Sequence, residues 1–417
     1  MIKDFRPVLK NSNFLYLWGS QLLSQLTINI MNFLLLLKLF ETTKSSVATS
    51  MLWVAYALPA ILVGPIGAAT VDFIDKRKIL IVSNLFQALA IFVFAFLHES
   101  RSFLIYGVVL AYSFLNQFYV PAESASLPAL VEAKLLPQAN SLFFLTQQGA
   151  LIFGFGFAGL LYRLIGFEKT LYLCGVLVFL AFISVLFLPK LEVEKGFAKD
   201  FDEEIGDFFN SILVGYRFIK EERKVLIPLL LLGGIQITLA ILVVNVPTLA
   251  TQVFKIGVEL AGMFLIVPAA IGASLGALSV SKLLKMGWRK KKVIELSMIF
   301  MTSSVFALVF IVPFLPGLIG KIAGFITMII IGFAFISTII PTQTFLQEST
   351  PKTFRGRVFG NFSFLVTVAT IFPVIFSGTI IEIFGAQLLL FMLGALALTV
   401  LLYSRKLDQG LLEAKSE

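Results

Sequence analysis

Polar side chains that interrupt long apolar runs are the first residues in this sequence that could do chemistry. Most are amides, which both donate and accept hydrogen bonds. Polar side chains within a membrane are energetically costly, so those that occur there usually serve a function. We therefore take them as candidates for binding a small molecule. The alternative is that they only join helices, at about 0.6 kcal/mol for each hydrogen bond. The set comprises Gln21, Gln25, Asn29, Asn32, Tyr112, Asn116, Gln117, Gln147, Gln148, Gln236 and Asn245.

Acidic side chains are absent from the middle of every apolar run and stand only at the ends or in connecting segments. Glu123, two residues after Pro121, is the one best placed for partial burial. Burial disfavours the charged form of a carboxyl group, so we predict that Glu123 is the residue that takes up and releases a proton if the protein's activity is coupled to protons. The alternative is a solvated or salt-bridged loop residue.

Other functional classes lack the residues that they need. His98, the only histidine, stands beside Glu99 and Arg101 in a short loop between two apolar runs, and Cys174 is the only cysteine. The spans therefore offer no catalytic histidine, and no cluster of residues has metal-ligand spacing. The phosphate-binding pattern Gly-x4-Gly-Lys-Ser/Thr is also missing, which argues against an ATP-driven pump. We expect no enzyme activity, no metal and no cofactor.

Membrane-spanning helices must position these residues. Of 417 residues, 58% are hydrophobic and 14% charged, with a mean hydropathy of +0.96, whereas a soluble domain carries about 25% charged residues. The apolar runs are near the roughly 20 residues that cross a bilayer as a helix. We predict an all-α membrane protein with twelve spans at about 14–40, 47–70, 78–97, 102–121, 140–164, 169–188, 225–253, 258–281, 293–314, 318–342, 358–384 and 386–404.

The spans form two similar halves. Pro59-Ala60 near the end of the second span has a counterpart in Pro268-Ala269 near the end of the eighth, and a basic cluster follows each pair. Related six-helix halves are typical of secondary transporters. We divide the chain into a six-helix bundle at 1–188, a cytoplasmic linker with an amphipathic helix at 189–224, and a second bundle with a cytoplasmic tail at 225–417.

The distribution of positive charge predicts the orientation. If both termini and the linker are cytoplasmic, 26 of the 33 Lys and Arg residues lie on that side, as the positive-inside rule requires. We therefore place both termini in the cytoplasm and the chain in the inner membrane. The net charge of +9 is explained in the same way, so we expect no nucleic-acid partner.

Three segments resemble the major facilitator superfamily, in the branch of macrolide-efflux proteins and the enterobactin exporter. Residues 64–78, Gly-Pro-Ile-Gly-Ala-Ala-Thr-Val-Asp-Phe-Ile-Asp-Lys-Arg-Lys, resemble the signature loop between helices 2 and 3. Residues 118–141 resemble the connection between helices 4 and 5, and 355–360 the entry into helix 11. The chain departs from the branch at Glu123, where an arginine is common, and at Gly154-Phe155, which replaces Gly-Pro.

The resemblance implies a central cavity and a cytoplasmic gate. Helices 1, 4, 7 and 10 line the cavity in this superfamily, which narrows the polar set to candidate substrate-binding residues. The gate would close when Asp72 accepts hydrogen bonds from the exposed N–H groups at the start of helix 11. The predicted substrate-binding residues are Asn29, Asn32, Asn116, Gln147, Gln236 and Asn245, and the predicted gating residues are Gly67, Asp72, Asp75, Lys76, Arg77, Lys78, Arg355 and Arg357.

These observations predict a secondary active transporter, an exporter of small amphipathic compounds such as a drug-like molecule or a siderophore, working by alternating access. Protons are the candidate coupling ion. The alternative is a lipid or lysophospholipid transporter of the same fold. The partners that we expect are the substrate, protons and the bilayer, with the chain acting as a monomer.

Overall fold

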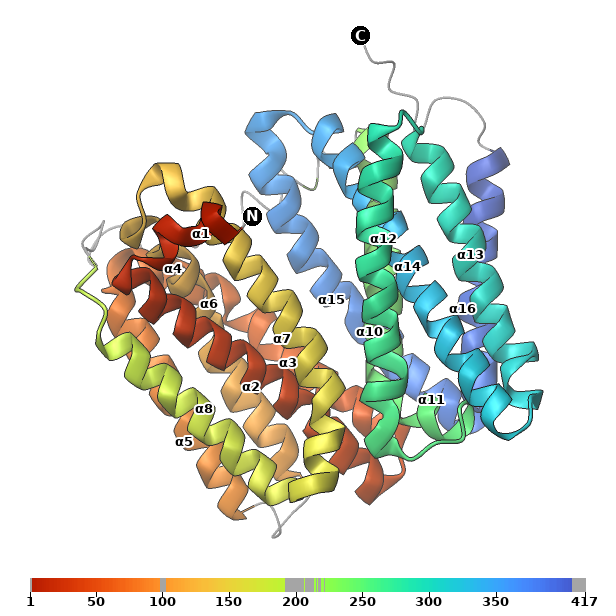
Figure 1. The fold of residues 1–417 in the computed structure, drawn as a ribbon, viewed down its shortest axis with the longest axis horizontal. Coiled ribbons are helices and arrows are strands. Elements are labelled where there is room, and N and C mark those ends of the chain that lie inside the picture. Colours follow the sequence, from red (N-terminus) through yellow and green to blue (C-terminus); the bar gives the residue numbers. More distant parts are fainter. Residues whose placement is uncertain are drawn as a thin grey trace. The chain divides into compact units, whose positions relative to one another are not determined.

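The computed structural model of the protein describes residues 2–97, 103–191 and 222–406, and residues 206, 214, 216, 219 and 220 between them (Figure 1). The described residues are helical apart from short turns, and no strand occurs among them. Most of the predicted linker, with its amphipathic helix, lies outside the described residues, as do the side chains of Asp72, Arg355 and Arg357.

The chain divides into two compact units. The first comprises Met1–Thr43 and Leu52–Phe209, and the second comprises Lys44–Met51 and Asn210–Glu417. The helix α3 (Ser46–Leu62) therefore begins in the second unit and continues in the first.

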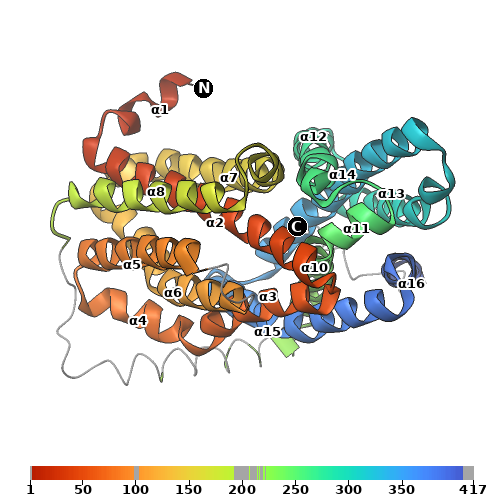
Figure 2. The same cartoon turned by 90° about the horizontal axis from the view of Figure 1, so that it is seen from below.

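The first unit is built around the long helix α2. It packs against α7 and α8, while α5 packs against α6 and α8, as the view in Figure 2 also shows. The helices of this unit, besides α3, are α1 (Ile2–Leu9), α2 (Ser12–Thr43), α4 (Gly64–Phe73), α5 (Lys76–Leu97), α6 (Leu104–Leu130), the short 3-10 helix Ala133–Leu135, α7 (Leu136–Ile165) and α8 (Phe167–Leu186).

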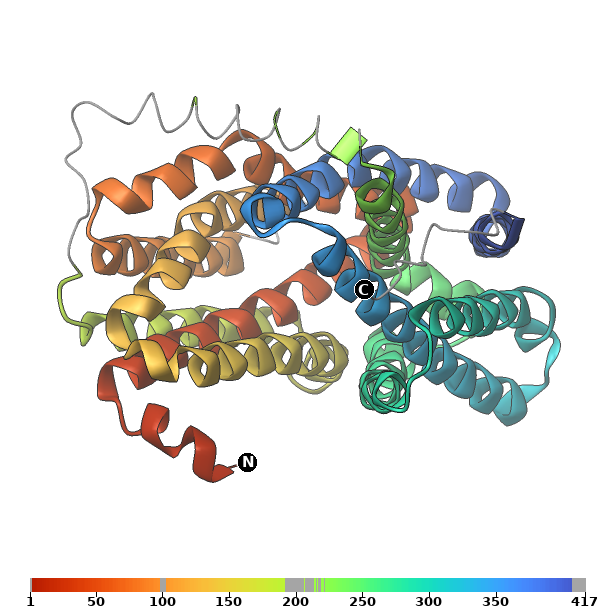
Figure 3. The same cartoon turned by 90° about the horizontal axis from the view of Figure 1, so that it is seen from above.

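The second unit is built around α14, which packs against α10, α12 and α13 (Figure 3). Its helices are α10 (Arg223–Val244), α11 (Val246–Gln252), the 3-10 helix Val258–Leu260, the π-helix Gly262–Ile266, α12 (Val267–Lys285), α13 (Lys290–Phe310), the 3-10 helix Val312–Phe314, α14 (Gly317–Ser349), α15 (Lys352–Phe384) and α16 (Ala386–Lys406).

The helices confirm the prediction of an all-α, multi-pass membrane protein. Among the described residues, ten helices are long and apolar enough to cross a membrane, and the pair α3 and α4 forms an eleventh candidate with a bend of 48°. Ala386–Leu402 of α16 is a shorter apolar helix, and with it these candidates correspond to the twelve predicted spans.

Two of the predicted spans are broken helices rather than straight ones. The span at 47–70 breaks at Val63, and the span at 225–253 breaks at Asn245. Pro65 and Pro247 explain the breaks, because each stands in the first turn of the next helix, where a missing N–H costs nothing. The hydropathy pattern could not show either break.

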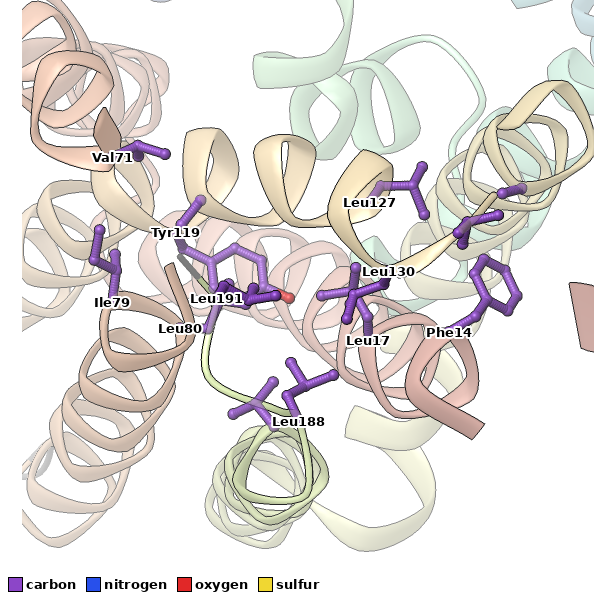
Figure 4. Packing of buried hydrophobic residues seen from close by; sticks show 14 of the residues in the cluster. Phe14, Leu17, Val71, Ile79, Leu80, Tyr119, Leu127, Leu130, Leu188 and Leu191 are labelled. Atoms are coloured by element: carbon purple, nitrogen blue, oxygen red, sulfur yellow. The ribbon is translucent and has the colours of Figure 1, made fainter. Parts of the chain in front are cut away.

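The helix α6 is longer than predicted. The sequence suggested that it ends at Pro121, but it continues through Pro121 and Pro128 to Leu130. Glu123 therefore lies inside a helix and not in the loop after it. Its neighbours along α6, Tyr119 and Leu127, belong to the buried apolar cluster of the first unit, which Figure 4 shows around Leu17, Leu80 and Leu130.

Candidate substrate pocket and its surroundings

A polar pocket of about 250 Å³ lies within the first unit. It is formed by α2, α3, α6 and α7, and it contains four of the predicted substrate-binding residues, Asn29, Asn32, Asn116 and Gln147. Gln25 and Tyr112 also came from the polar set of the sequence. The complete lining is Ser24, Gln25, Ile28, Asn29, Asn32, Tyr56, Tyr112, Asn116, Tyr119, Val120 and Gln147.

Helical spacing explains why several of these side chains share the pocket. Gln25, Asn29 and Asn32 follow one another at intervals of four and three residues on α2, which places them on one face. Tyr112 and Asn116 are related in the same way on α6. The sequence reading missed Ser24, Tyr56 and Tyr119, and for Tyr119 the same spacing, three residues after Asn116, was the available signal.

A close contact between α2 and α7 holds one wall of the pocket. A Cβ atom added at Gly154 of α7 would overlap with Asn29 of α2 and would lie 3.1 Å from the backbone nitrogen of Ile30. Asn29 donates from Nδ2 to the carbonyl oxygen of Gln25 at 2.7 Å, which fixes its side chain against its own helix. Glycine at 154 therefore sets the distance between the helices that carry Asn29 and Gln147.

Gly67 makes a similar contact next to the pocket. A Cβ at this position of α4 would overlap with the carbonyl oxygen of Gln117 on α6. The structure thus places Gly67 against α6 within the first unit, where only a residue without a side chain lets the two backbones approach this closely.

Glu123 is buried behind the pocket, with 5% of its surface exposed. Its Oε1 atom accepts a hydrogen bond from the hydroxyl of Tyr119 at 2.8 Å. Tyr119 also lies 3.2 Å from Ser20 Oγ, and Asn84 joins Ser20 to Ser24 through contacts of 3.1 and 3.3 Å. The carboxyl group is thus connected to two pocket residues, Tyr119 and Ser24, although it does not line the pocket itself.

The predicted gating residues near the start of α5 tie parts of the first unit together. Asp75 is the residue before α5, and its Oδ1 atom accepts from the N–H of Arg77 at 3.0 Å and from the N–H of Leu191 at 3.2 Å. Arg77 donates to the carbonyl oxygen of Leu186, the last residue of α8, at 2.6 Å. Lys76 is buried and Lys78 is exposed.

The other two predicted binding residues, Gln236 and Asn245, belong to the second unit. Gln236 is exposed on α10. Asn245 is fully buried at the break between α10 and α11, where its Nδ2 atom donates to Ile241 O at 2.8 Å and to Ser377 Oγ at 2.9 Å. Its Oδ1 atom has no hydrogen-bond partner.

The start of α3 is anchored in the second unit. Glu382 of α15 accepts hydrogen bonds from the Ser45 hydroxyl and, at 3.0 Å, from the N–H of Val47. Ser46 Oγ lies 2.8 Å from Thr248 Oγ1 of α11. A carboxylate at a helix N-terminus is stabilised by the exposed N–H groups and the helix dipole. The sequence analysis did not assign Glu382 any role.

The chain is similar to known transporters over most of its length. The sequence model of the family described as Major Facilitator Superfamily matches residues 17–373. The MFS-type transporter YfiS of Bacillus subtilis, itself uncharacterized, is 25% identical over 404 residues, which cover 95% of this chain and 93% of that protein. Macrolide efflux protein A of Streptococcus pyogenes is 25% identical over 235 residues, covering 52% of this chain and 58% of that protein.

Solved structures show the same fold. The structure of the nucleoside transporter NupG aligns with a TM-score of 0.70 at 16% identity, covering 95% of this chain and 99% of that one. The POT family transporter PepTSo aligns with a TM-score of 0.69 at 13% identity, covering 95% and 98%. At such identities the likeness concerns the fold alone.

Proposed function

The chain belongs to the major facilitator superfamily, and from that premise we propose that it is a secondary active exporter of small amphipathic compounds that works by alternating access. It is a transporter and not an enzyme. The observation that carries the proposal is the polar pocket of the first unit, where amides from three helices converge. The similarity to macrolide efflux protein A supports export.

The pocket lining suits a substrate that is polar at one end. Asn29, Asn32, Asn116 and Gln147 offer donors and acceptors from α2, α6 and α7. Tyr56 and Tyr112 add aromatic surface beside hydroxyl groups, which is the combination that binds groups with an apolar body and a polar edge. We extend the substrate path to Gln236 and Asn245 of the second unit, because alternating access uses both halves.

Protons are the coupling ion in this proposal, and Glu123 is the residue that exchanges them. It is the buried carboxyl group next to the pocket. Of the gating residues, Gly67 provides the close approach of α4 to α6, and Asp75 and Arg77 hold the segment between α4 and α5 against the end of α8. We keep Asp72, Lys76, Lys78, Arg355 and Arg357 as gating residues on the sequence pattern.

We further propose that the chain lies in the inner membrane as a monomer, with both termini and the linker in the cytoplasm. The basis for the orientation is the distribution of Lys and Arg along the sequence.

The lipid-transport alternative has one observation in its favour. An apolar groove of about 460 Å³ lies between α2 and α7 of the same unit, and an acyl chain would suit such a surface. Its lining is Leu22, Leu26, Ile30, Thr146, Gly149, Ala150, Phe153 and Phe157.

The test is transport into inside-out membrane vesicles that contain the protein. Ethidium, erythromycin and lysophosphatidylethanolamine are offered with and without an inward-acidic pH gradient. Uptake of ethidium or erythromycin that the gradient accelerates supports the proposal, and vesicles with Asn116→Ala should lose it. Uptake of lysophosphatidylethanolamine alone would favour the lipid alternative, and uptake that ignores the gradient would reject proton coupling.

A further inference from the structure

A chain of hydrogen bonds leads from the pocket to Glu123, and ionised Glu123 fixes its direction, because a carboxylate can only accept hydrogen bonds. Tyr119 donates its only hydroxyl proton to Glu123 Oε1 at 2.8 Å. In the contact of 3.2 Å between Tyr119 and Ser20, the serine must then be the donor.

The same reasoning fixes the remaining bonds. Ser20 Oγ accepts from Asn84 Nδ2 at 3.1 Å, and Asn84 Oδ1 accepts from Ser24 Oγ at 3.3 Å. An amide cannot exchange its donor and acceptor ends without turning over. Every proton in the sequence Ser24, Asn84, Ser20, Tyr119 therefore points toward Glu123.

This arrangement is built for a negative charge at its end. The members of the chain are almost fully buried, where hydrogen bonds polarise one another and are stronger than in water. Four donors aligned toward one carboxyl oxygen stabilise the ionised form, because a charge-assisted hydrogen bond is about twice as strong as a neutral one.

The other end of the chain opens into the pocket. Ser24 gives its proton to Asn84, so the part of Ser24 that faces the pocket can only accept a hydrogen bond. A substrate group that donates there, such as an ammonium N–H or a hydroxyl, extends the chain by one more aligned donor.

We propose that Ser24, Asn84, Ser20 and Tyr119 form a one-way hydrogen-bond chain through which a donor group of the substrate stabilises ionised Glu123, so that substrate binding and protonation of Glu123 exclude one another. This rests on the proposed function and names the substrate class as compounds with a protonated amine. When the substrate binds, the O–H bond of Glu123 breaks, the proton passes to water and the carboxylate keeps the electron pair. When the substrate leaves, water returns the proton.

Other ionisable groups near Glu123 stand outside this chain. On α6 itself, Tyr112 is an ionisable residue of the same helix and of the pocket lining. The helices packed against α6 are α2, α4, α5 and α7. Their charged residues are Lys38 and Glu41 on α2, Asp72 on α4, Lys76, Arg77 and Lys78 on α5, and Arg163 on α7.

None of these charged residues belongs to the hydrogen-bond chain between the pocket and Glu123. Tyr119 is the ionisable residue within that hydrogen-bond chain. Lys38 is eighteen residues beyond Ser20 on α2, or roughly 27 Å along the helix axis. The basic residues of α5 occupy its first turn, with Arg77 bonded to Leu186. Ser20, Ser24 and Asn84 cannot titrate, so a proton change that depends on them must reach Glu123 through Tyr119.

The test counts protons by calorimetry on the purified full chain. Benzyldimethylammonium is titrated in phosphate and in Tris, whose different ionisation heats report the protons released for each probe bound, between about pH 5 and pH 9. Benzyltrimethylammonium is the matched probe, since it keeps the charge and the ring but has no N–H. We expect the first probe to release up to about one proton and the second to release at most a few tenths of that.

Variants distinguish the role of the hydrogen-bond chain from the role of Glu123. Glu123→Gln should bind the first probe without proton release. Tyr119→Phe and Ser24→Ala, which break the chain at its two ends, should each reduce the release at least twofold. Ser126→Ala is the control, because Ser126 is buried one turn from Glu123 but bonds only to the carbonyl oxygen of Ala122, and it should release as many protons as wild type.

The outcomes distinguish this inference from the proposed function. Undiminished release in Glu123→Gln would remove Glu123 from coupling and so overturn the proposed function as well. Proton release that vanishes in Glu123→Gln but persists in Tyr119→Phe and Ser24→Ala would overturn only the role of the hydrogen-bond chain. Equal proton release by the two probes would overturn the inference, because it would show that Glu123 responds to the charge of the probe and not to its N–H donor. If neither probe binds, the proposed substrate class is wrong.

Discussion

The contact between Gly154 and Asn29 allows a prediction with a built-in control. Replacing Gly154 with alanine adds a Cβ that overlaps with Asn29. The same change at Gly149, on the same helix, adds a Cβ that meets nothing within 4 Å. Both changes remove the entropic cost of a helical glycine, which is worth about 1 kcal/mol. The difference between the unfolding free energies of the two variants therefore measures the cost of pushing α2 and α7 apart.

The size of that difference follows from the packing. The neighbours of the new atom at Gly154 include the backbone carbon of Asn29 and the nitrogen of Ile30, both at 3.1 Å. Backbone atoms within a helix cannot move aside singly, so the helices must shift, and overpacking of this kind costs about 1–3 kcal/mol. Gly149→Ala should be stabilised by up to about 1 kcal/mol, and Gly154→Ala should be about 1–3 kcal/mol less stable than Gly149→Ala.

The assay is reversible unfolding in mixed micelles, with the helix signal in circular dichroism as the readout for both variants and the wild type. Vesicle transport is measured in parallel, because Asn29 lines the pocket. Gly154→Ala should also transport less than Gly149→Ala at equal protein content. Equal stability of the two alanine variants would refute the reasoning, since it would mean that α2 and α7 do not meet at Gly154.

The remaining predictions concern coupling, anchoring and orientation. Glu123→Gln should leave downhill substrate movement intact and abolish its acceleration by a pH gradient in vesicles, and a variant that still responds fully would exclude Glu123 from coupling. Asp75→Ala removes the acceptor for two N–H groups and should lower the free energy of unfolding by about 0.5–2 kcal/mol in the micelle assay, while Asp75→Asn should recover most of the loss. Glu382→Ala removes the acceptor at the start of α3 and should expose a cysteine placed at Ser46 to faster maleimide labelling than Glu382→Gln does, with equal rates counting against the anchor. A cysteine placed in the linker should react with a membrane-impermeant maleimide only in inside-out vesicles, and labelling in intact cells would reverse the orientation.

Part of the candidate site could be read from the sequence. Gln25, Asn29 and Asn32 on one helix and Asn116 on another were visible as amides at helical spacing within apolar runs, and the structure places them in one pocket with Gln147. Gln236 and Asn245 carried the same signal in the second unit, where Gln236 is exposed and the Nδ2 atom of Asn245 donates to Ile241 and Ser377. The amide signal alone does not tell a lining residue from one that joins helices.

The sequence did not show that Glu123 lies within a helix. Proline is the strongest local sign of a helix end, so Pro121 suggested a loop. The structure shows that the helix continues through Pro121 and that Glu123 is buried on it. Proline costs a helix one backbone hydrogen bond, and membrane-spanning helices tolerate this loss. The donor chain through Tyr119, Ser20 and Asn84 joins residues from three helices, and no spacing rule connects them.

The sequence by itself determined the membrane class and the helical spans, because these depend on local hydropathy and on the length of helix that crosses a bilayer. It also contained the signature segment around Asp75. The tertiary structure decided which faces of the helices meet, through contacts such as those of Gly67 with Gln117 and Gly154 with Asn29, each made by residues far apart in the chain. It also decided that Glu123 is buried and bonded to Tyr119. The reason is that burial and hydrogen bonding depend on neighbours in space, and a single sequence records only neighbours along the chain.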